Sequence, residues 1–452
     1  MQGLRVLRAS VVNQTILSGW GRYPLVPGNE VVSEDLAAAT KTASLTRGLG
    51  RSYGDSSLPA RAGLTVANST RADRLIAFNP KTRVLRAEAG LSLSEILRLF
   101  LPRGYFVPVT PGTQYVTLGG MVASDVHGKN HHREGCFGEH VTALTMRLAS
   151  QRIVECSPTR ERELFRATIG GMGLTGHILE VAFRMQAIAS PWIWSESERV
   201  PSIEAYLDAL KRAGPGWPFT VGWIDCLSRG ATAGRGILIK GRWAERHEAP
   251  ATPPPSKRRL AVPFTLPSFV LSRLSVRVFN ELYFRKHPAG VRRGIVHPET
   301  FFYPLDMILH WNRIYGPRGF TQYQCVLPES AGRGAARAFL EIAARYQGAS
   351  FLCVIKDCGK EGVGMLSFPK PGISIALDFP IRDDTQAMVD ALNENVIRAG
   401  GRIYLTKDAF TRAEHFRAME PRLPRFLVFR NKLDPKRAIR SAQSVRVFGD
   451  AA

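Results

Sequence analysis

Short stretches of alternating apolar and polar residues run along the whole chain, mixed with stretches of helical periodicity. Residues 84–89 alternate like a strand, and Ser92 and Glu95 then have the spacing of a capping box, which predicts a helix through Phe100. Further strands are predicted over residues 141–148, 152–156, 177–185, 219–225, 236–240, 320–327, 350–356, 373–378 and 402–405. Further helices are predicted over residues 161–168, 203–212, 335–346 and 386–399, and from about residue 412. Short strands mixed with short helices indicate an α+β fold.

The chain changes character after Ala187, and with 452 residues it is longer than one hydrophobic core usually serves. We therefore expect two domains. The first comprises residues 1–187, with residues 402–452 returning to it. The second, residues 188–401, is predicted to be an antiparallel sheet covered by helices.

The net charge narrows the choice of partners. Sixty-one Lys and Arg residues against 38 Asp and Glu residues give a formal charge of +23, which suggests an anionic partner such as nucleic acid, a phospholipid surface or a phosphorylated substrate. Aromatic residues and lysines do not interleave as they do in an RNA-binding platform, so nucleic acid is not expected.

Cysteine use and hydropathy bear on the compartment. The six cysteines are scattered and form no CxxC pair, which favours a reducing compartment. No uninterrupted apolar run reaches the ~18 residues of a transmembrane helix. We therefore expect a cytoplasmic protein, soluble or peripheral at the inner membrane.

Residues 249–296 form a basic segment in which nine Lys and Arg residues are interleaved with apolar side chains. A helix over residues 268–285 would place Leu271, Leu274, Val278 and Leu282 on one face. Two interpretations are open: a basic amphipathic helix on an anionic membrane surface, or a helix that packs against a domain with a solvated basic rim.

Three glycine-rich loops carry the candidate chemistry. Residues 111–140 hold six glycines and three central histidines, and residues 47–54 and 170–176 are also rich in glycine. Glycine lets backbone approach a ligand closely, so we interpret these loops as a ligand cradle. Residues 171–176 match GxGxxG, but a predicted helix precedes them and a strand follows, which is the reverse of a Rossmann fingerprint.

The histidines at positions 127, 131 and 132 raise the question of a metal. Gly128 and Asn130 disfavour the helix that an HxxxH zinc motif needs, so no metal is expected. An alternative interpretation of His131 and His132 is that they are surface histidines in a polar loop.

The three loops in this order resemble a known family. RGLGRSYG at 47–54, PGT and TLGGMVASDVHGKNHH within 111–132, and ATIGGMGLTG at 167–176 resemble the PCMH-type flavin-binding domain of the vanillyl-alcohol-oxidase superfamily. Within it, the oxidase subunits of decaprenylphosphoryl-ribose 2-epimerases are the most similar, because the resemblance continues through QYQ at 322–324, LDFP at 377–380 and TKD at 406–408. It covers nearly the whole chain.

The resemblance implies FAD as cofactor. Arg51 stands where many relatives have a histidine that attaches to the flavin, so non-covalent binding is expected. The implied cofactor-binding residues are Arg47, Gly48, Gly50, Arg51, Ser52, Tyr53, Gly54, Pro111, Gly112, Thr113, Thr117, Gly119, Gly120, Ser124, His127, Gly128, Asn130, Gly170, Gly173, Gly176, Ile178 and Lys407.

The resemblance also implies a substrate site and two catalytic residues. The substrate-binding residues would be Tyr53, Lys129, Trp223, Phe302, Gln322, Gln324, Lys356, Ser374 and Ala376. Oxidation of a secondary alcohol transfers a hydride to the flavin while the hydroxyl loses its proton. Lys407 would supply a cation beside the reduced flavin or act as the base, and His127 would be the base or orient the sugar.

The pocket wall departs from the mycobacterial members at three positions. Ala376 replaces a cysteine, Ser374 an asparagine and Phe302 a tyrosine. These exchanges bear on the identity of the lipid and the sugar more than on the reaction type.

The expected activity is therefore FAD-dependent oxidation of the 2-hydroxyl of a polyprenyl-phosphoryl ribose, the first half of epimerisation to an arabinose donor for cell-wall arabinan. The expected partners are that lipid-linked phosphoryl sugar, an NAD-dependent short-chain reductase subunit and an anionic membrane surface. Two alternatives are oxidation of a soluble alditol or sugar lactone, and a flavin-containing scaffold without turnover.

Overall fold

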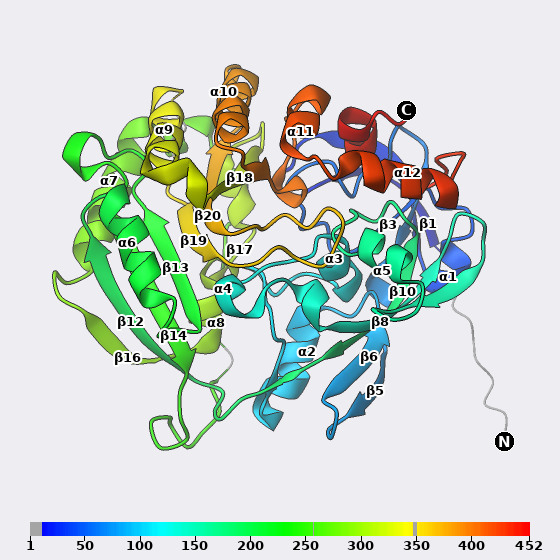
Figure 1. Cartoon of the computed structure of the whole chain (residues 1–452), viewed down its shortest axis with the longest axis horizontal. Coiled ribbons are helices and arrows are strands. Elements are labelled where there is room, and N and C mark those ends of the chain that lie inside the picture. The colour runs from blue at the N-terminus through cyan, green and yellow to red at the C-terminus, as the bar shows by residue number, and fades with distance from the viewer. Residues whose placement is uncertain (1–10, 256, 347–349) are drawn as a thin grey trace.

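A computed structural model describes residues 11–255, 257–346 and 350–452 of the chain (Figure 1). The α+β class is confirmed, since most of the described strands pair antiparallel. Parallel pairing is confined to residues 65–68, which pair with 29–32 and 45–47, and to residues 260–261 with 308–309. The first ten residues of the predicted first domain lie outside the described residues. No helix among the described residues is both long enough and apolar enough to cross a bilayer.

The N-terminal part of the chain contains two sheets. The strands of the first, in spatial order, are β1 (Val11–Ser18), β2 (Leu25–Val32), β4 (Thr65–Asn68) and β3 (Leu45–Arg47). Those of the second, antiparallel throughout, are β5 (Leu75–Asn79), β6 (Val84–Glu88), β10 (His177–Arg184), β8 (Val141–Arg147) and β9 (Ile153–Cys156). Leu85 and Ala87 of β6 are buried on either side of a partly exposed residue, as expected for a strand with one face on a core. Six of the eight residues of the central strand β10 are buried, so both of its faces are covered.

Short helices join these sheets to the glycine-rich loops. The predicted helix α2 (Leu93–Phe100) begins at Ser92, whose hydroxyl accepts a hydrogen bond from Glu95 N at 3.3 Å. α3 (Leu118–Ala123) lies inside the long glycine-rich loop, and α4 (His131–Glu134) follows it. α5 (Arg162–Thr168) precedes GxGxxG and β10 follows it, so the rejection of the Rossmann interpretation is confirmed.

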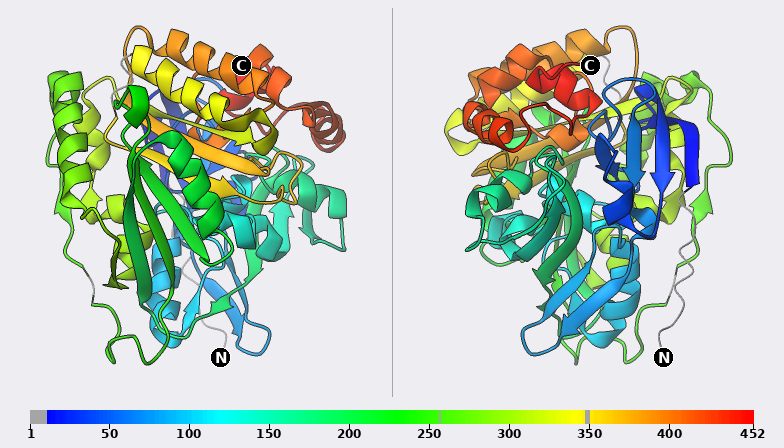
Figure 2. Two further views of the ribbon diagram at one scale, coloured as in Figure 1. Left: turned by 60° about the vertical axis from the view of Figure 1, so that its left-hand side comes forward. Right: turned by 90° about the vertical axis from the view of Figure 1, so that its right-hand side faces the viewer.

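One eight-stranded antiparallel sheet dominates the rest of the chain. Its strands, in spatial order, are β16 (Arg292–Val296), β12 (Ile193–Val200), β14 (Gly236–Trp243), β13 (Phe219–Ile224), β19 (Cys353–Cys358), β20 (Gly372–Pro380), β18 (Phe320–Pro328) and β21 (Arg402–Ile403). Three helices cover one of its faces: α6 (Ile203–Ala213), α9 (Gly332–Arg345) and α10 (Thr385–Arg398) (Figure 2). The packing is close, since a Cβ on Gly222 of β13 would lie 2.1 Å from the Tyr206 hydroxyl of α6.

Two predicted elements are wrong in detail. The helix over 268–285 is broken into a 3₁₀ turn, Ser268–Leu271, and the helix α7 (Arg273–Lys286), because Ser272 is extended and caps α7 by accepting from Ser275 N. Leu271 is also only 7% exposed and packs into the core, so it does not share the outer face of α7. The strand over 402–405 ends at Ile403, after which Leu405–Lys407 form a 3₁₀ turn.

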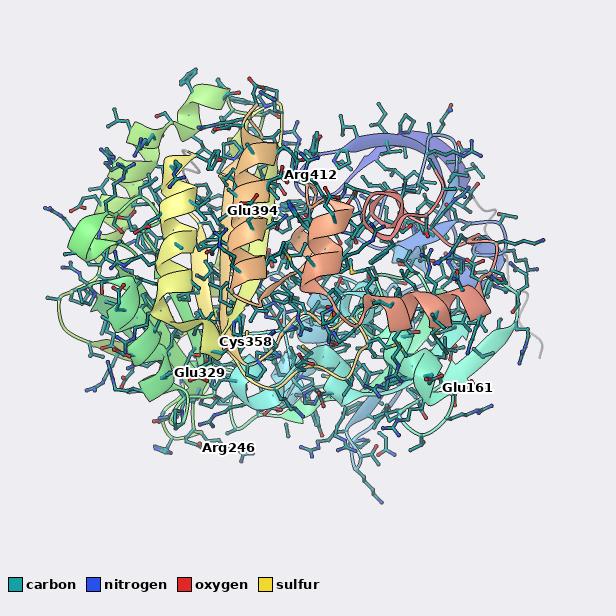
Figure 3. All side chains as sticks on the ribbon, turned by 45° about the horizontal axis from the view of Figure 1, so that its top comes forward. Glu161, Arg246, Glu329, Cys358, Glu394 and Arg412 are labelled. Atoms are coloured by element: carbon teal, nitrogen blue, oxygen red, sulfur yellow. The ribbon has the colours of Figure 1, made fainter. Side chains whose placement is uncertain are left out.

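The C-terminal residues bridge the two parts of the molecule. α11 (Ala413–Met419) lies beside α10, where Arg412 pairs with Asp390 at 3.0 Å (Figure 3). α12 (Leu423–Leu433) carries Arg430, which is fully buried and donates to the carbonyl oxygen of Leu174 in the third glycine-rich loop at 3.2 Å. The division into domains stays a prediction, since residues after 402 contact both parts.

Arg430→Ala should weaken the fold strongly, because it leaves the Asp450 carboxylate, 2.6 Å away and 2% exposed, buried without its main partner. Arg437 lies 3.6 Å from that carboxylate and offsets part of the loss, so we expect the free energy of unfolding to fall by about 3 kcal/mol. Urea denaturation followed by tryptophan fluorescence measures this. Arg425→Ala is the control, since its pair with Glu163 is 64% and 63% exposed and should contribute less than about 1 kcal/mol.

Candidate active site

A cavity of about 1470 Å³ lies between the glycine-rich loops and the face of the large sheet that the helices leave free. Its sheet side is lined by residues two positions apart: 221 and 223 of β13, 322 and 324 of β18, and 354 and 356 of β19. Successive strand residues point to opposite faces, so this spacing shows that one face of the sheet forms the wall. The intervening Tyr323 packs on Phe339 of α9, on the opposite face.

Most of the predicted cofactor-binding residues line the opposite side of this cavity. These are Gly48, Gly50, Arg51, Ser52, Tyr53, Pro111, Gly112, Thr113, Thr117, Gly119, Gly120, Ser124, His127, Gly128, Gly173, Gly176, Ile178 and Lys407. Nothing lies within 4 Å of where a Cβ would sit on Gly112 or Gly173, so their backbone borders open space. A Cβ on Gly48 would come 2.3 Å from the Thr117 hydroxyl, which caps α3.

Four of the predicted cofactor-binding residues lie behind the loops and shape them. Arg47 donates to the carbonyl oxygen of Ser18 at 2.6 Å and to the Ser57 hydroxyl at 2.8 Å. The Asn130 amide donates to the carbonyl oxygen of Pro108 at 2.8 Å. Gly54 leaves no room for a Cβ, which would lie 1.9 Å from Asp408 O, and Gly170 has a left-handed φ of 71° beside Ser367.

The loops fit a large, flat cofactor that carries phosphates. The cavity exceeds the roughly 300–1,000 Å³ of an ordinary small-molecule site, and backbone from three loops faces it. Glycine-rich backbone of this kind presents N–H groups to phosphate oxygens. Arg51 adds a cation whose guanidinium lies 4.0 Å from the centre of the Trp20 ring and 5.2 Å from that of Tyr115.

Similarity to known proteins supports a cofactor of this kind. A model of the FAD binding domain matches residues 32–157. The chain is 34% identical over 439 residues, 93% of this chain and 94% of the relative, to the decaprenylphosphoryl-beta-D-ribose oxidase of Mycolicibacterium smegmatis. The chain belongs to this family of FAD-dependent oxidoreductases. FAD is its cofactor, as predicted.

Two further relatives match different shares of this chain. An uncharacterized protein of Streptomyces coelicolor is 30% identical over 359 residues, 76% of this chain and 96% of that protein. A putative D-arabinono-1,4-lactone oxidase of Neurospora crassa is 27% identical over 128 residues, which is 28% of this chain and 23% of that protein.

Three lysines project into the cavity of this oxidoreductase. Lys129 Nζ donates to the carbonyl oxygen of Phe302 at 3.0 Å, Lys356 Nζ lies 3.3 Å from His127 Nδ1, and Lys407 Nζ lies 3.9 Å from the centre of the Tyr53 ring. Within the described part of the chain, no carboxylate lies within ion-pair distance of any of them. Any charge that these amines carry is therefore not paired with a carboxylate among the described residues before a ligand binds.

Burial lowers the pKa of all three lysines. It brings the pKa of Lys129 to about 7, with Lys356 adding repulsion, and that of Lys356 to about 8. The pKa of Lys407 is lowered by burial, which the Asp378 carboxylate partly opposes. Near neutral pH these amines therefore exchange protons more readily than surface lysines do.

His127 is buried and its two ring nitrogens already have protein neighbours. Nε2 lies 3.0 Å from Gln324 Nε2, and Nδ1 lies 3.3 Å from Lys356 Nζ. Burial, followed by repulsion from Lys356, holds the pKa of His127 well below its usual value, so the ring is neutral. A neutral imidazole accepts at only one nitrogen, so Lys356 and Gln324 do not both donate to it.

Three substrate-site predictions concern the sheet wall and its support. Phe302 and Ala376 line the cavity, whereas Ser374 does not. Ser374 is fully buried and its hydroxyl accepts from Gln324 Nε2 at 3.0 Å, so it orients a residue of the wall. The remaining predicted substrate-binding residues, Tyr53, Lys129, Trp223, Gln322, Gln324 and Lys356, line the cavity.

Asp378 is a functional candidate that sequence reasoning missed. It is fully buried, faces Gln322 across strands β18 and β20, and accepts a hydrogen bond from the Gln322 amide. Burial raises its pKa. The signal was present in the sequence, because 374, 376 and 378 alternate on one face of a predicted strand.

Sequence reasoning also missed a strap, which we define as residues 359–371 between β19 and β20. It leaves β19 after Cys358 and crosses to the glycine-rich loops (Figures 1 and 3). Its Phe368 stacks on Tyr404, with ring centres 4.8 Å apart, and lies 5.5 Å from the His127 ring. Gly359 N donates to His131 Nδ1 at 3.0 Å. The strap thus supports the histidine loop from behind.

Asp125 fastens this strap. Its carboxylate accepts from the Ser367 hydroxyl of the strap and from Gly138 N, the latter at 2.8 Å, and its φ of 40° is left-handed. A non-glycine residue adopts this conformation at a cost, which the two hydrogen bonds offset.

The three histidines of the loop do not converge. His132 Nε2 lies 2.9 Å from the carbonyl oxygen of Trp217, while His131 and His127 face the strap and the cavity. Among the described residues, no group of three histidine, cysteine or acidic side chains is arranged to hold a metal ion.

Asp125→Asn should remove a pH dependence of stability. Burial raises the pKa of Asp125 from 3.8 to about 6, so its contribution is complete below the unfolded value and is lost as the pH rises through 6. An asparagine does not titrate: its Oδ1 can accept from Gly138 N as the carboxylate does, while its Nδ2 would donate to the Ser367 hydroxyl oxygen. Between pH 4 and pH 8 the variant should gain up to about 3 kcal/mol of unfolding free energy relative to the wild type.

Urea denaturation at both pH values measures the difference. Asp208→Asn, at a pair with Arg333 whose carboxylate side is 39% exposed, is the control and should follow the wild type. A difference that stays constant with pH would show that Asp125 is ionised throughout.

Proposed function

We propose that this enzyme oxidises the 2-hydroxyl of a polyprenyl-phosphoryl ribose to the 2-keto sugar. The observation that carries the proposal is the group of three cavity lysines without carboxylate partners. Buried charges are costly unless they are paired, so the site is suited to an anionic ligand. A phosphodiester supplies that charge, and the similarity to the decaprenylphosphoryl-beta-D-ribose oxidase of Mycolicibacterium smegmatis supports the sugar.

Two side chains would handle the hydroxyl proton. Bound FAD supplies the acceptor for the hydride on C2, and the hydroxyl proton goes to a protein base. Lys407 suits that role, because its amine faces the cavity with the Tyr53 ring as its near contact and has a lowered pKa. His127 has a protein neighbour at each ring nitrogen, Gln324 at Nε2 and Lys356 at Nδ1, so it suits orienting the sugar hydroxyl.

The remaining expectations follow from this reaction. A 2-keto sugar product needs a hydride donor to become the arabinose epimer, so a separate NAD-dependent short-chain reductase is proposed as the partner. Non-covalent attachment of FAD and a cytoplasmic site of action at the inner membrane belong to the same proposal. Gel filtration of the denatured protein, followed by absorbance, separates free from attached flavin.

A soluble alditol or sugar lactone is the alternative substrate. The similarity to a putative lactone oxidase supports it over about a quarter of the chain only. A neutral polyol leaves the charges of Lys129 and Lys356 without a partner, which argues against it.

The proposal is tested by anaerobic bleaching of the bound flavin. Prenyl-phosphoryl ribose should abolish the visible flavin absorbance, while free ribitol and a sugar lactone should not. Bleaching by the neutral compounds alone would favour the alternative. Absence of bleaching by any of them would favour a scaffold without turnover.

Lys129→Met should separate a phosphoryl substrate from a neutral one. A hydrogen bond to a charged group contributes about 1.5–3 kcal/mol, so the dissociation constant of the phosphoryl sugar should rise about 10- to 100-fold. Binding of a neutral pentitol should be unchanged. Lys211→Met is the matched control, since that lysine pairs with Glu329 on the surface at 57% exposure.

A further inference from the structure

We propose that the outer face of α7, together with the turn before it, docks on an anionic lipid bilayer and places the mouth of the cavity against the membrane. This rests on the proposed function, because a lipid-linked substrate has to be reached at the bilayer surface. The occupant is a phospholipid surface and not a second protein.

The outer face of α7 carries an apolar stripe that is exposed to solvent. Leu274 is 71% exposed, Val278 50% and Leu282 64%, and the spacing of four residues aligns them along one side of the helix. Phe269, in the 3₁₀ turn just before α7, is 77% exposed.

Exposed apolar side chains are concentrated in this region. Eight of the 18 exposed large apolar side chains described lie within residues 249–296, a tenth of the chain. Single exposed apolar residues are ordinary, but a contiguous group marks an interaction surface.

The charge around the stripe is complementary to anionic lipid. Residues 249–296 contain nine Lys and Arg residues and one acid, Glu281, which pairs with Arg235 and Arg285. Arg277, Lys286 and Arg292 are exposed and form no ion pair among the described contacts. Each basic residue at an anionic surface adds attraction that salt weakens.

The inner face of α7 is a wall of the cavity. Val276, Phe279 and Tyr283 line the cavity from this helix, while the stripe at 274, 278 and 282 points away from it. α7 lies at one side of the molecule, at the margin of the large sheet (Figures 1 and 2). A helix seated in the headgroup layer would thus separate lipid on one side from the substrate site on the other.

Vesicle co-sedimentation of the FAD-loaded enzyme tests the proposal. Vesicles of phosphatidylcholine with about 30% phosphatidylglycerol should bind the enzyme, and pure phosphatidylcholine vesicles should bind it at least tenfold more weakly. A triple variant, Leu274→Ser, Val278→Ser and Leu282→Ser, should lose at least tenfold in binding to the anionic vesicles. Its flavin absorbance and melting temperature should match those of the wild type, because all three side chains are exposed.

The control variant is Val12→Ser with Ile16→Ser, at exposed positions of β1 that are 63% and 66% exposed. It should bind vesicles like the wild type. Equal binding by the triple variant, or equal binding to neutral and anionic vesicles, would overturn the proposal. Dimers that the triple variant converts to monomers, without vesicle binding by the wild type, would also overturn it and assign the stripe to a second copy.

The results can distinguish failure of membrane docking from failure of the proposed function. Vesicle binding without bleaching by lipid-linked ribose would leave the docking face intact and remove the substrate assignment. Bleaching by the same substrate in detergent, with no vesicle binding, would support the substrate assignment and overturn the docking face.

Discussion

The burial of three lysines around one cavity is the constraint on which the site depends. Lys129, Lys356 and Lys407 face the same space without a carboxylate in ion-pair distance among the described residues. Such burial is possible only because the surrounding scaffold is rigid: two cores, a sheet packed tightly on α6, and a buried arginine at the C-terminal end. The folding free energy thus offsets the cost of burying these lysines, which preorganises the site for an anion.

Both the sheet and the strap position the residues around the cavity. Strands β18, β19 and β20 present Gln324, Lys356 and Ala376 from neighbouring positions on one face. The strap then carries the chain from the same sheet to the flavin loops and supports His127 with Phe368. The histidine is therefore positioned by residues more than 200 positions later in the chain.

Local pattern predicted a large part of this structure. The cap at Ser92, the strands β18 and β20 and the reversed order around GxGxxG follow from periodicity and turn chemistry, which act over a few residues. The break at Ser272 was missed, because the apolar spacing of Leu271 and Leu274 fits a helix while their burial differs. Phe368 was missed because it reaches His127 through a long crossing loop, which no local pattern encodes. The face on which Asp378 lies could be predicted from the alternation of 374, 376 and 378, but its pairing with Gln322 could not, because strand register sets it.

The cross-strand pair of Gln324 and Ala376 has a consequence for how such enzymes diverge. Opposite residues of an antiparallel pair lie side by side, so position 376 can change size without moving the amide that contacts His127. At this position, which lines the cavity, the chain offers only a methyl group. A reagent that bonds covalently to thiols therefore has no point of attachment at this position, because a methyl group carries no nucleophile.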